Sequence, residues 1–357
     1  MTYSPLHHGK RGDQAHRPRP SKRWLMVLAM DLRQLQAIVA IAEQGSFSAA
    51  ADALSTVQSN VSTHVKKLER ELGTQLVDRA SGQLTDAGAL VVARAKRVLR
   101  ELDALTADVT ALSQEIVGTV RVGAIGTAAR WLVPQLVDIT PLRHPQLHLV
   151  FVEATTTGLG EQLSSGQVDV GVLALPGGGP EIRTIPLYEE DLVLVVPRDH
   201  PFAEHQRVPL AALAGIPLFL PLPGTAFRDE LDAQAEAAGI TLRAKAEMDS
   251  VRLMASLTFD RAGYSVLPAG AIPAYLQSSF AQLPIVGLPP RLVGVAQRRR
   301  GLPGAPVRAV LEILSEIIYD PDRVPAGVRP VGAAAAHPPI VPIAGPFARR
   351  HDESSAG

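Results

Sequence analysis

The regular pattern of apolar and polar positions begins with a short helix at Asp31. Asp31 can cap this helix and Gly45 can end it. A second short helix, "FSAAADAL", can be capped by Ser46, and only Ser55 and Thr56 separate it from a third. The apolar stripe of the first helix consists of Leu32, Leu35, Ile38, Val39 and Ala42. Two helices joined by so tight a turn predict a helix-turn-helix.

The third helix has two faces of different character. Its apolar face, expected to pack inward, consists of Val61, Val65, Leu68 and Leu72. Its polar face holds Gln58, Ser59, Ser62, Thr63, Lys66, Lys67 and Arg70. Hydrogen-bonding groups at the N-terminal turns and cations at the last turns suit a helix that enters a DNA major groove by its N-terminus. A solvated amphipathic helix would show the same pattern, so this alternative stays open for the helix alone.

A longer helical pattern follows Thr85, which can cap it. Its apolar residues are spaced alternately by four and three, at Val91, Ala95, Val98, Leu102, Leu105, Val109, Leu112 and Ile116. This heptad seam predicts a coiled coil that pairs two chains, although a core helix could carry a similar stripe. The residues expected at the dimer contact are Val91, Val98, Leu102, Leu105, Val109 and Leu112. A dimer would place two recognition helices on half-sites about 34–36 Å apart.

Beyond Gly118, strand-like and helical patterns alternate. Strands are predicted at "TVRVGAI", "LHLVFVEA", "DVGVLAL", "DLVLVVP", "IPLFLP", "YSVLP" and "RLVGVAQ". Such alternation predicts an α/β architecture with mainly parallel sheets, long enough to form two lobes.

Several hydroxyl residues follow these strands directly. In open α/β sheets, ligands bind outside the carboxyl ends of the strands, near helix N-termini. The candidate ligand-binding residues are therefore Thr127, Ala128, Thr155, Thr156, Thr225 and Ser250. Hydroxyls together with helix-start amides favour an anionic group such as a carboxylate. Each Thr or Ser could instead simply cap its own helix.

Composition limits the chemistry that is available. The 357 residues include no cysteine, which excludes disulfides, thiol catalysis and thiolate metal ligands and fits a cytoplasmic protein. Lys and Arg together number 35, as do Asp and Glu, so overall charge does not indicate a nucleic-acid partner. Between residues 31 and 90 there are five basic and seven acidic residues, so DNA binding would depend on where the charges lie and on pairing of chains.

The two ends of the chain have a different composition. Residues 1–30, basic and poor in apolar positions, predict a disordered extension, with a non-specific DNA-binding arm as the alternative. Residues 320–357, rich in Pro, Ala and Gly, predict a flexible tail. No apolar run reaches the roughly 18 residues of a membrane span, and "WLMVLAM" is short for a signal peptide, so neither membrane insertion nor export is expected.

The N-terminal segment resembles the DNA-binding domain of LysR-type transcriptional regulators. The resemblance is carried by "AIAEQGSFSAAADALSTVQSNVSTHVKKLERELGTQLVDR" followed by "LTDAG". "LVDR" stands where the family often has Leu-Phe-x-Arg. The resemblance implies a winged helix-turn-helix with its wing near Ser81 to Leu84. It also implies that Arg79 meets the DNA backbone and that Asn60 and Thr63 help define the operator.

The resemblance also implies the organisation of the whole chain. An α+β multidomain protein is expected, with a winged helix-turn-helix at 31–90, a linker helix at 91–117 and a two-lobed α/β effector domain similar to periplasmic binding proteins at 118–319. Lobe I would span about 119–189 plus 290–319, and lobe II about 190–289. The implied partners are double-stranded DNA, a small-molecule effector and further copies of the chain, as a homodimer or homotetramer.

A regulator explains both halves of the sequence. No nucleophile–base pair, paired acids, metal cluster or phosphate loop is recognisable, so neither an enzyme, a cofactor nor a metal is expected. A small-molecule-binding protein without a DNA-reading role, the alternative, would leave residues 31–116 unexplained. The predicted function is sequence-specific DNA binding modulated by a small-molecule, anionic effector.

Overall fold

The computed structural model describes residues 30–111 and 115–331 and divides the chain into two compact units, Met1–Leu99 and Arg100–Gly357. The expected disordered extension before Met30, the tail beyond residue 331 and the seam residue Leu112 lie outside the described ranges. None of the described helices combines the length and apolar character needed to cross a bilayer.

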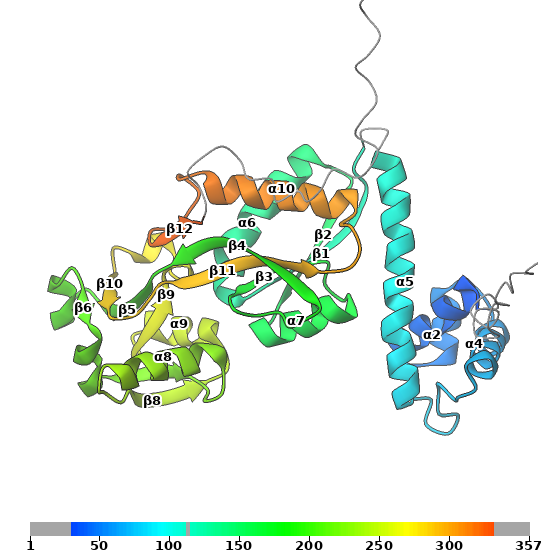
Figure 1. The fold of residues 1–357 in the computed structure, drawn as a ribbon, viewed down its shortest axis with the longest axis horizontal. Helices are drawn as coiled ribbons and strands as arrows, with labels where there is room; N and C mark the ends of the chain where they lie inside the picture. The colour runs from blue at the N-terminus through cyan, green and yellow to red at the C-terminus, as the bar shows by residue number, and fades with distance from the viewer. Residues whose placement is uncertain (1–29, 112–114, 332–357) are drawn as a thin grey trace, which may run out of the picture. The chain divides into compact units, whose positions relative to one another are not determined.

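The N-terminal unit consists of three short helices and the first part of a long one (Figure 1). The helices are α2 (Leu32–Gln44), α3 (Phe47–Ala53), α4 (Gln58–Leu72) and α5 (Asp86–Ala111). Asp31 caps α2 in a reciprocal capping box with Gln34, and Ser46 caps α3, as predicted. Gly45 ends α2 in the left-handed conformation, with φ of 75°. These local signals set the helix-turn-helix.

One hydrophobic core holds the four helices together. Val61, Val65 and Leu68 of α4 are buried against α2 and α3, and Ala50 and Ala51 allow α3 to approach closely. Leu72, predicted to point inward, is 39% exposed because it is the last residue of α4 before Gly73 turns the chain away.

The segment between α4 and α5 is a narrow turn closed by one antiparallel bridge between Val77 and Leu84. Thr85 caps α5, accepting a hydrogen bond from the Gly88 N–H at 3.0 Å. Gly88 is required by close packing, because a Cβ there would lie 2.0 Å from the Leu76 carbonyl oxygen. The "LTDAG" motif therefore fixes the start of α5 against the turn.

The C-terminal unit contains two mixed six-stranded sheets flanked by helices (Figure 1). Its helices are α6 (Gly126–Arg143), α7 (Thr156–Ser165), α8 (Ala226–Ala237), α9 (Val251–Phe259) and α10 (Ala305–Tyr319), with 3-10 turns η1 (Pro201–Glu204), η2 (Leu210–Gly215), η3 (Ala269–Ala271) and η4 (Ala274–Leu276). Its strands are β1 (Gly118–Ala124), β2 (Leu147–Glu153), β3 (Val170–Ala174), β4 (Ile182–Glu190), β5 (Leu192–Pro197), β6 (Val208–Pro209), β7 (Pro217–Pro221), β8 (Arg243–Met248), β9 (Tyr264–Pro268), β10 (Phe280–Val286), β11 (Arg291–Arg298) and β12 (Val328–Pro330).

Each sheet forms the centre of one lobe. The strand orders are β12-β4-β11-β3-β1-β2 in lobe I and β6-β10-β5-β9-β7-β8 in lobe II. The chain passes from lobe I to lobe II between β4 and β5 and returns between β10 and β11. The expectation of mainly parallel sheets was wrong, since β4, β5, β10, β11 and β12 enter antiparallel pairs. These strands run between the lobes or along an edge and are not joined by helical crossovers within one sheet.

The sequence pattern missed five strands, β4, β6, β8, β10 and β12, and placed the start of the tail too early; β6 has only two residues. β4, β8 and β10 carry prolines or many charged residues in place of a clear apolar alternation. Residues 328–330, expected in the flexible tail, form β12 and pair with β4. The pairing buries Val328 against lobe I, which explains why this part of a Pro-rich segment is ordered.

Candidate nucleic-acid interface and effector domain

The polar face of α4 is accessible along its length. Gln58, Ser59 and Asn60 in the first turn are exposed, as are Thr63 and Lys66 further along, while Ser62 is half-buried. The buried opposite face fixes the orientation of these side chains, because α4 cannot rotate without exposing Val61, Val65 and Leu68.

Local hydrogen bonds restrict two of these polar side chains. The Asn60 amide donates to the Thr56 hydroxyl at 3.0 Å, and the Thr63 hydroxyl donates to the Ser59 carbonyl at 2.7 Å. Among the described residues, the Gln58 and Lys66 side chains have no hydrogen-bond partner. The two side chains can therefore reach an external partner without breaking an internal contact.

Lys67 contributes to the fold of the domain. Its Nζ lies 3.4 Å from the carboxylate of Asp31, the residue that caps α2. The Gln34 N–H, and then Lys67, stabilise the charged carboxylate and lower the pKa of Asp31. The sequence motif did not reveal this pairing, which joins residues 36 positions apart.

Arg79 is also held by a partner within the domain. Its guanidinium donates to the Glu69 carboxylate at 2.7 Å and lies 5.7 Å from the centre of the Phe47 ring. Glu69 also accepts hydrogen bonds from the N–H groups of Leu76 and Val77. Burial alone would raise the pKa of Glu69, but these hydrogen bonds outweigh it and the pKa is lowered. Arg79 is 40% exposed and presents part of its charge beside α4.

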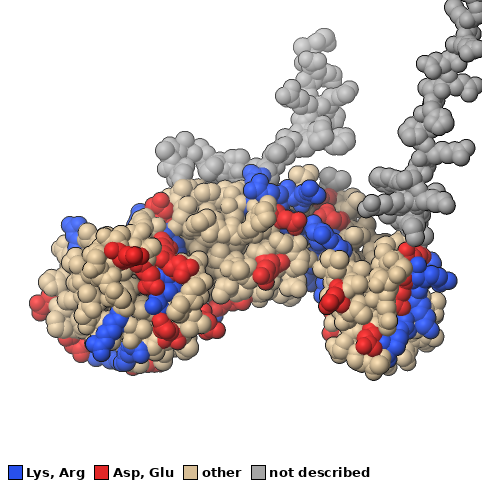
Figure 2. Space-filling view, turned by 60° about the horizontal axis from the view of Figure 1, so that its bottom comes forward, with Lys and Arg blue, Asp and Glu red and all other residues tan. Residues whose placement is uncertain are grey.

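The charge of the N-terminal unit is unevenly distributed over its surface. In Figure 2, Lys and Arg side chains of this unit gather along one side. Lys66 and Arg70, both exposed, lie one turn apart on α4. A locally basic surface exists even though acidic residues outnumber basic ones in the segment.

The predicted coiled-coil seam divides into two parts along α5. Val91 is half-buried and Ala95 is buried against the helix-turn-helix core. Four later apolar residues are exposed: Val98 45%, Leu102 38%, Leu105 62% and Val109 60%. Ile116, expected on the seam, lies beyond the end of α5 and packs against the core of lobe I, so the seam is shorter than predicted. Four large apolar side chains at heptad spacing thus lie uncovered on one face of a single helix.

Another face of α5 attaches to lobe I of the effector domain. The Arg100 guanidinium donates to the Ser165 carbonyl at the end of α7, at 3.0 Å. Asp108 accepts from the Ala305 N–H at 2.7 Å and from Arg308 at 3.2 Å. Gly304, the N-cap of α10, has no side chain for capping, so Asp108 of α5 serves this purpose.

Three of the six expected effector residues cap their own helices. The hydroxyls of Thr155, Thr225 and Ser250 accept hydrogen bonds from N–H groups three residues further along, at 3.2, 3.4 and 3.3 Å. The alternative that these hydroxyls cap their own helices is therefore correct for these three residues. Capping does not prevent the remaining lone pair and O–H from meeting a ligand.

The other three expected residues lie at the starts of α6 and α7. Ala128 is fully buried, and Thr156 is half-buried as the first residue of α7. Thr127 is 3% exposed, and its hydroxyl accepts a hydrogen bond from Arg291 at 2.7 Å. Among the described residues, Thr127 is thus tied to a cation that the sequence pattern had not singled out.

Arg291 connects parts of both lobes. Its Nε donates to the Glu190 carboxylate at 3.0 Å, and its guanidinium carbon lies 5.6 Å from the Phe227 ring centre in lobe II. Glu190 is fully buried, and its second oxygen accepts from the Gly270 N–H at 3.3 Å. The sequence offered only a partial signal: Arg291 is a single charge directly before an apolar run, which requires a partner if it is buried, whereas Glu190 stands between Glu189 and Asp191 and is not singled out.

The surroundings of this ion pair are buried and include aromatic side chains. The Tyr188 ring packs edge-to-face on Trp131 at 5.4 Å, and burial raises the pKa of Tyr188 well above its usual range. Burial also raises the pKa of Glu230 on α8, against the opposing charge of Arg291. Two titratable groups with raised pKa values, Tyr188 and Glu230, therefore lie near the Arg291–Glu190 pair.

Two further contacts join the lobes near their mutual boundary. The Arg130 Nε on α6 donates to the Ala271 carbonyl in η3 at 2.8 Å. Arg252 on α9 forms an ion pair with Glu153 at the end of β2, and this pair is solvent-exposed. The two ion pairs are thus expected to differ in strength: Arg291–Glu190 is buried between two strands of lobe I, and Arg252–Glu153 is an exposed contact between the lobes.

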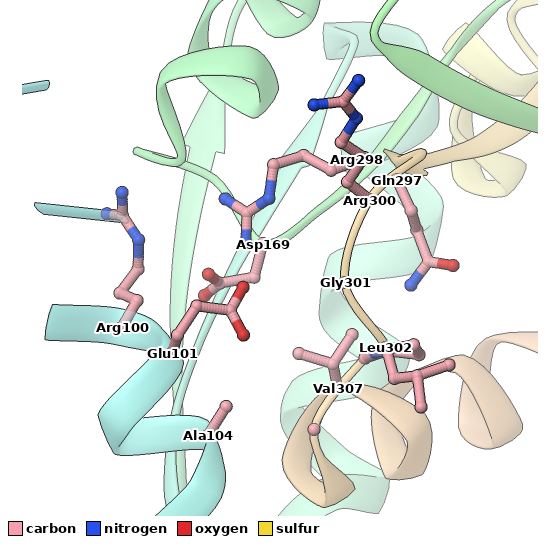
Figure 3. A pocket seen from close by; sticks show the side chains of 12 residues that line it. Arg100, Glu101, Ala104, Asp169, Gln297, Arg298, Arg300, Gly301, Leu302 and Val307 are labelled. Atoms are coloured by element: carbon pink, nitrogen blue, oxygen red, sulfur yellow. The ribbon is translucent and has the colours of Figure 1, made fainter. Parts of the chain in front are cut away.

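A separate pocket of about 80 Å³ lies between α5 and lobe I. Figure 3 shows Arg100 and Glu101 of α5 on one side and Arg298, Arg300 and Leu302 on the other. It includes none of the six expected effector residues. In the described part of the chain, no group of three or more His, Asp or Glu residues is arranged to hold a metal ion.

Comparisons with known families match both units. Residues 32–89 match the family described as "Bacterial regulatory helix-turn-helix protein, lysR family", and residues 113–317 match the "LysR substrate binding domain". The first match covers α2, α3 and α4, and the second covers both lobes except β12.

Similar sequences occur in named bacterial regulators. The chain is 32% identical over 293 residues to the "DNA-binding transcriptional dual regulator OxyR" of Escherichia coli, covering 81% of this chain and 95% of that protein. It is 33% identical over 295 residues to the "Probable hydrogen peroxide-inducible genes activator" of Mycobacterium leprae, covering 80% and 93%.

Solved structures show the same fold. A full-length OxyR variant from Pseudomonas aeruginosa matches with a TM-score of 0.64 and 29% identity, covering 80% of this chain and 94% of that one. Full-length CbnR in complex with its target DNA matches with a TM-score of 0.60 and 27% identity, covering 80% and 98%.

Proposed function

The chain belongs to the LysR family of bacterial DNA-binding transcriptional regulators with an effector-binding domain, and from this premise we propose which residues perform each task. α4 enters the major groove by its N-terminal end, and Gln58, Ser59, Asn60, Ser62 and Thr63 face the bases. The observation that carries this proposal is the exposed polar first turn of α4 above a buried apolar face.

Cations further along α4 contact phosphates. Lys66 is the best placed of those expected, because it is exposed and unpaired within the described structure. Lys67 and Arg79 have internal partners in Asp31 and Glu69. Because these internal carboxylates already neutralise part of their charge, we expect Lys67 and Arg79 to contribute less to phosphate binding than Lys66 does.

The seam on α5 pairs two copies of the chain. Exposed Val98, Leu102, Leu105 and Val109 at heptad spacing fit knobs-into-holes packing with an identical helix. A dimer, alone or within a tetramer, presents two recognition helices to one duplex. This arrangement compensates for the weak net charge of the N-terminal segment.

The effector binds where the lobes meet, and its anionic group faces Arg291 and the start of α6. Thr127 already bonds Arg291 there, so an anion reaching this point would exchange partners with Glu190 or Thr127. Such an exchange would alter contacts between the lobes. Because Arg100 and Asp108 attach α5 to lobe I, the change would reach the paired helices and thus the spacing of the recognition helices.

DNA binding that responds to an effector requires no catalytic step. We propose that the chain acts without catalysis, cofactor or metal, in the cytoplasm, where bacterial DNA is accessible. We also propose a domain division close to that expected from the sequence. The DNA-binding domain would end near residue 90, and the effector domain would be followed by a tail that starts after β12.

Selection of binding sites from random duplex DNA by the purified full-length protein tests the proposal. We expect an enriched, near-palindromic motif with half-sites about one helical turn apart. Gln58→Ala should relax the preference at one position of each half-site, with a loss of discrimination of about 1–3 kcal/mol. Enrichment of no motif, with the dimer intact and candidate effectors present, would contradict the DNA-reading function and favour a small-molecule-binding protein.

A second prediction separates this chain from relatives named for hydrogen peroxide. Reversible oxidation of proteins by peroxide proceeds mainly through cysteine thiolates, and this chain contains no cysteine. Peroxide treatment should therefore leave operator affinity unchanged within about twofold at doses that convert thiols to sulfenic acids or disulfides. DNA titrations before and after treatment, with mass spectrometry of the five methionines, provide the measurement. A reversible, dose-dependent change in affinity would show that another group senses peroxide.

A further inference from the structure

The residue at the start of α4 is unusual for its position. Val57 is the N-cap of this helix, and its side chain forms no capping hydrogen bond. The two preceding helices of the same domain are capped by Asp31 and Ser46. Ser, Thr, Asp and Asn are preferred at N-caps because their oxygens satisfy N–H groups of the first turn. α4 therefore lacks the stabilising capping hydrogen bond that Asp31 and Ser46 provide to α2 and α3.

Packing does not compensate for the missing cap. The Val57 side chain is 59% exposed, whereas Val61 and Val65 on the same helix are 1% and 0% exposed. A β-branched apolar residue that neither caps nor packs departs from local preferences. Departures of this kind are expected where function selects the residue.

The backbone holds Val57 in a defined place beside the expected base-reading residues. Its carbonyl accepts hydrogen bonds from the Asn60 N–H at 3.0 Å and from the Val61 N–H at 3.4 Å. On its other side, Ser55 adopts the left-handed conformation with φ of 52°, and the Thr56 hydroxyl is bound by the Asn60 amide. Val57 is thus an exposed apolar group on a fixed turn, directly before Gln58.

The major groove offers one apolar group on the base edges, the 5-methyl group of thymine. A phosphate contact would favour a hydroxyl or a cation at this position, and a methyl contact favours an apolar side chain. We infer that Val57 reads a thymine methyl group in each half-site of the operator. The inference rests on the proposed entry of α4 into the major groove, and it adds one thymine per half-site to the bases that α4 contacts.

The test replaces single thymines by deoxyuridine, which lacks only the 5-methyl group. The preferred site of the full-length protein is first obtained by selection, and each thymine is then replaced in turn. At one thymine per half-site, we expect the affinity to fall about fourfold, as for the loss of one buried methyl group. At the other thymines the loss should be small.

Val57→Ser separates reading from folding, because serine restores a cap while removing both methyl groups. This variant should keep or raise the melting temperature and should no longer distinguish thymine from deoxyuridine at that position. Leu72→Ser, at the opposite end of α4 and 39% exposed, is the matched control and should retain the full deoxyuridine effect.

The outcomes distinguish this inference from the proposed function. A motif that is enriched but shows no deoxyuridine-sensitive thymine, or the same sensitivity in Val57→Ser, would overturn the role of Val57 and leave DNA reading intact. Failure to enrich any motif would overturn both. Loss of the sensitivity in Val57→Ser, with retention in Leu72→Ser, would establish the contact.

Discussion

Alanine in place of Glu190 is expected to destabilise the effector domain by about 3–5 kcal/mol, because it leaves a buried cation without its partner. Glu190 is fully buried, and the Arg291 side chain is only 7% exposed. The pair also connects β4 and β11, the two strands of lobe I that lead to and from lobe II. Denaturant unfolding, followed by Trp131 fluorescence in a Trp24→Phe background, measures the loss. Trp131 packs on Tyr188 beside this site.

The exposed ion pair between Glu153 and Arg252 provides the matched control. Its partners are 38% and 60% exposed, and Glu153→Ala should cost less than about 1 kcal/mol. A double variant, Glu190→Leu with Arg291→Met, should recover much of the stability, because no charge stays buried without a partner. If Glu190→Ala lowered the free energy of unfolding no more than Glu153→Ala does, the Glu190–Arg291 pair would be accessible to water and the prediction would be wrong.

Local signals predicted the N-terminal unit in detail. Caps at Asp31, Ser46 and Thr85 and the helix end at Gly45 depend on residues within three or four positions, which a sequence displays directly. The predicted burial of the apolar face of α4 is confirmed for Val61, Val65 and Leu68. Only its terminal member, Leu72, differs, because helix periodicity does not indicate where the chain leaves the core.

Contacts between distant residues were not accessible to the same reasoning. Glu190 and Arg291 lie 101 positions apart, and Thr127 and Arg291 lie 164 apart. β4, which carries Glu190, was not recognised because Pro186 and its charged residues hide the strand pattern. The hydroxyls chosen for effector binding did follow strand ends as expected. The sequence left open whether these hydroxyls cap their own helices, and the structure shows that three of them do.

Replacing Leu105 by Glu is expected to separate the paired chains and to weaken binding to a two-half-site duplex by about 10²–10⁴-fold, the advantage of linking two sites. Leu105 is 62% exposed and lies between Leu102 and Val109 on the seam. A carboxylate there would be buried among the apolar side chains of the paired helices, at the cost of desolvation. Analytical ultracentrifugation and fluorescence anisotropy with one-half-site and two-half-site duplexes measure both effects.

Thr110→Glu is the control that isolates the seam from the added charge. Thr110 lies one position beyond Val109, on neither the seam nor the face of α5 that carries Arg100 and Asp108. This variant should keep the oligomeric state and the affinity. In Leu105→Glu, binding to a single half-site should stay near its original value, since the recognition helix is intact. A Leu105→Glu protein that remained a dimer would exclude the seam as the interface. A monomer with unchanged affinity for both duplexes would show that each chain reads its site alone.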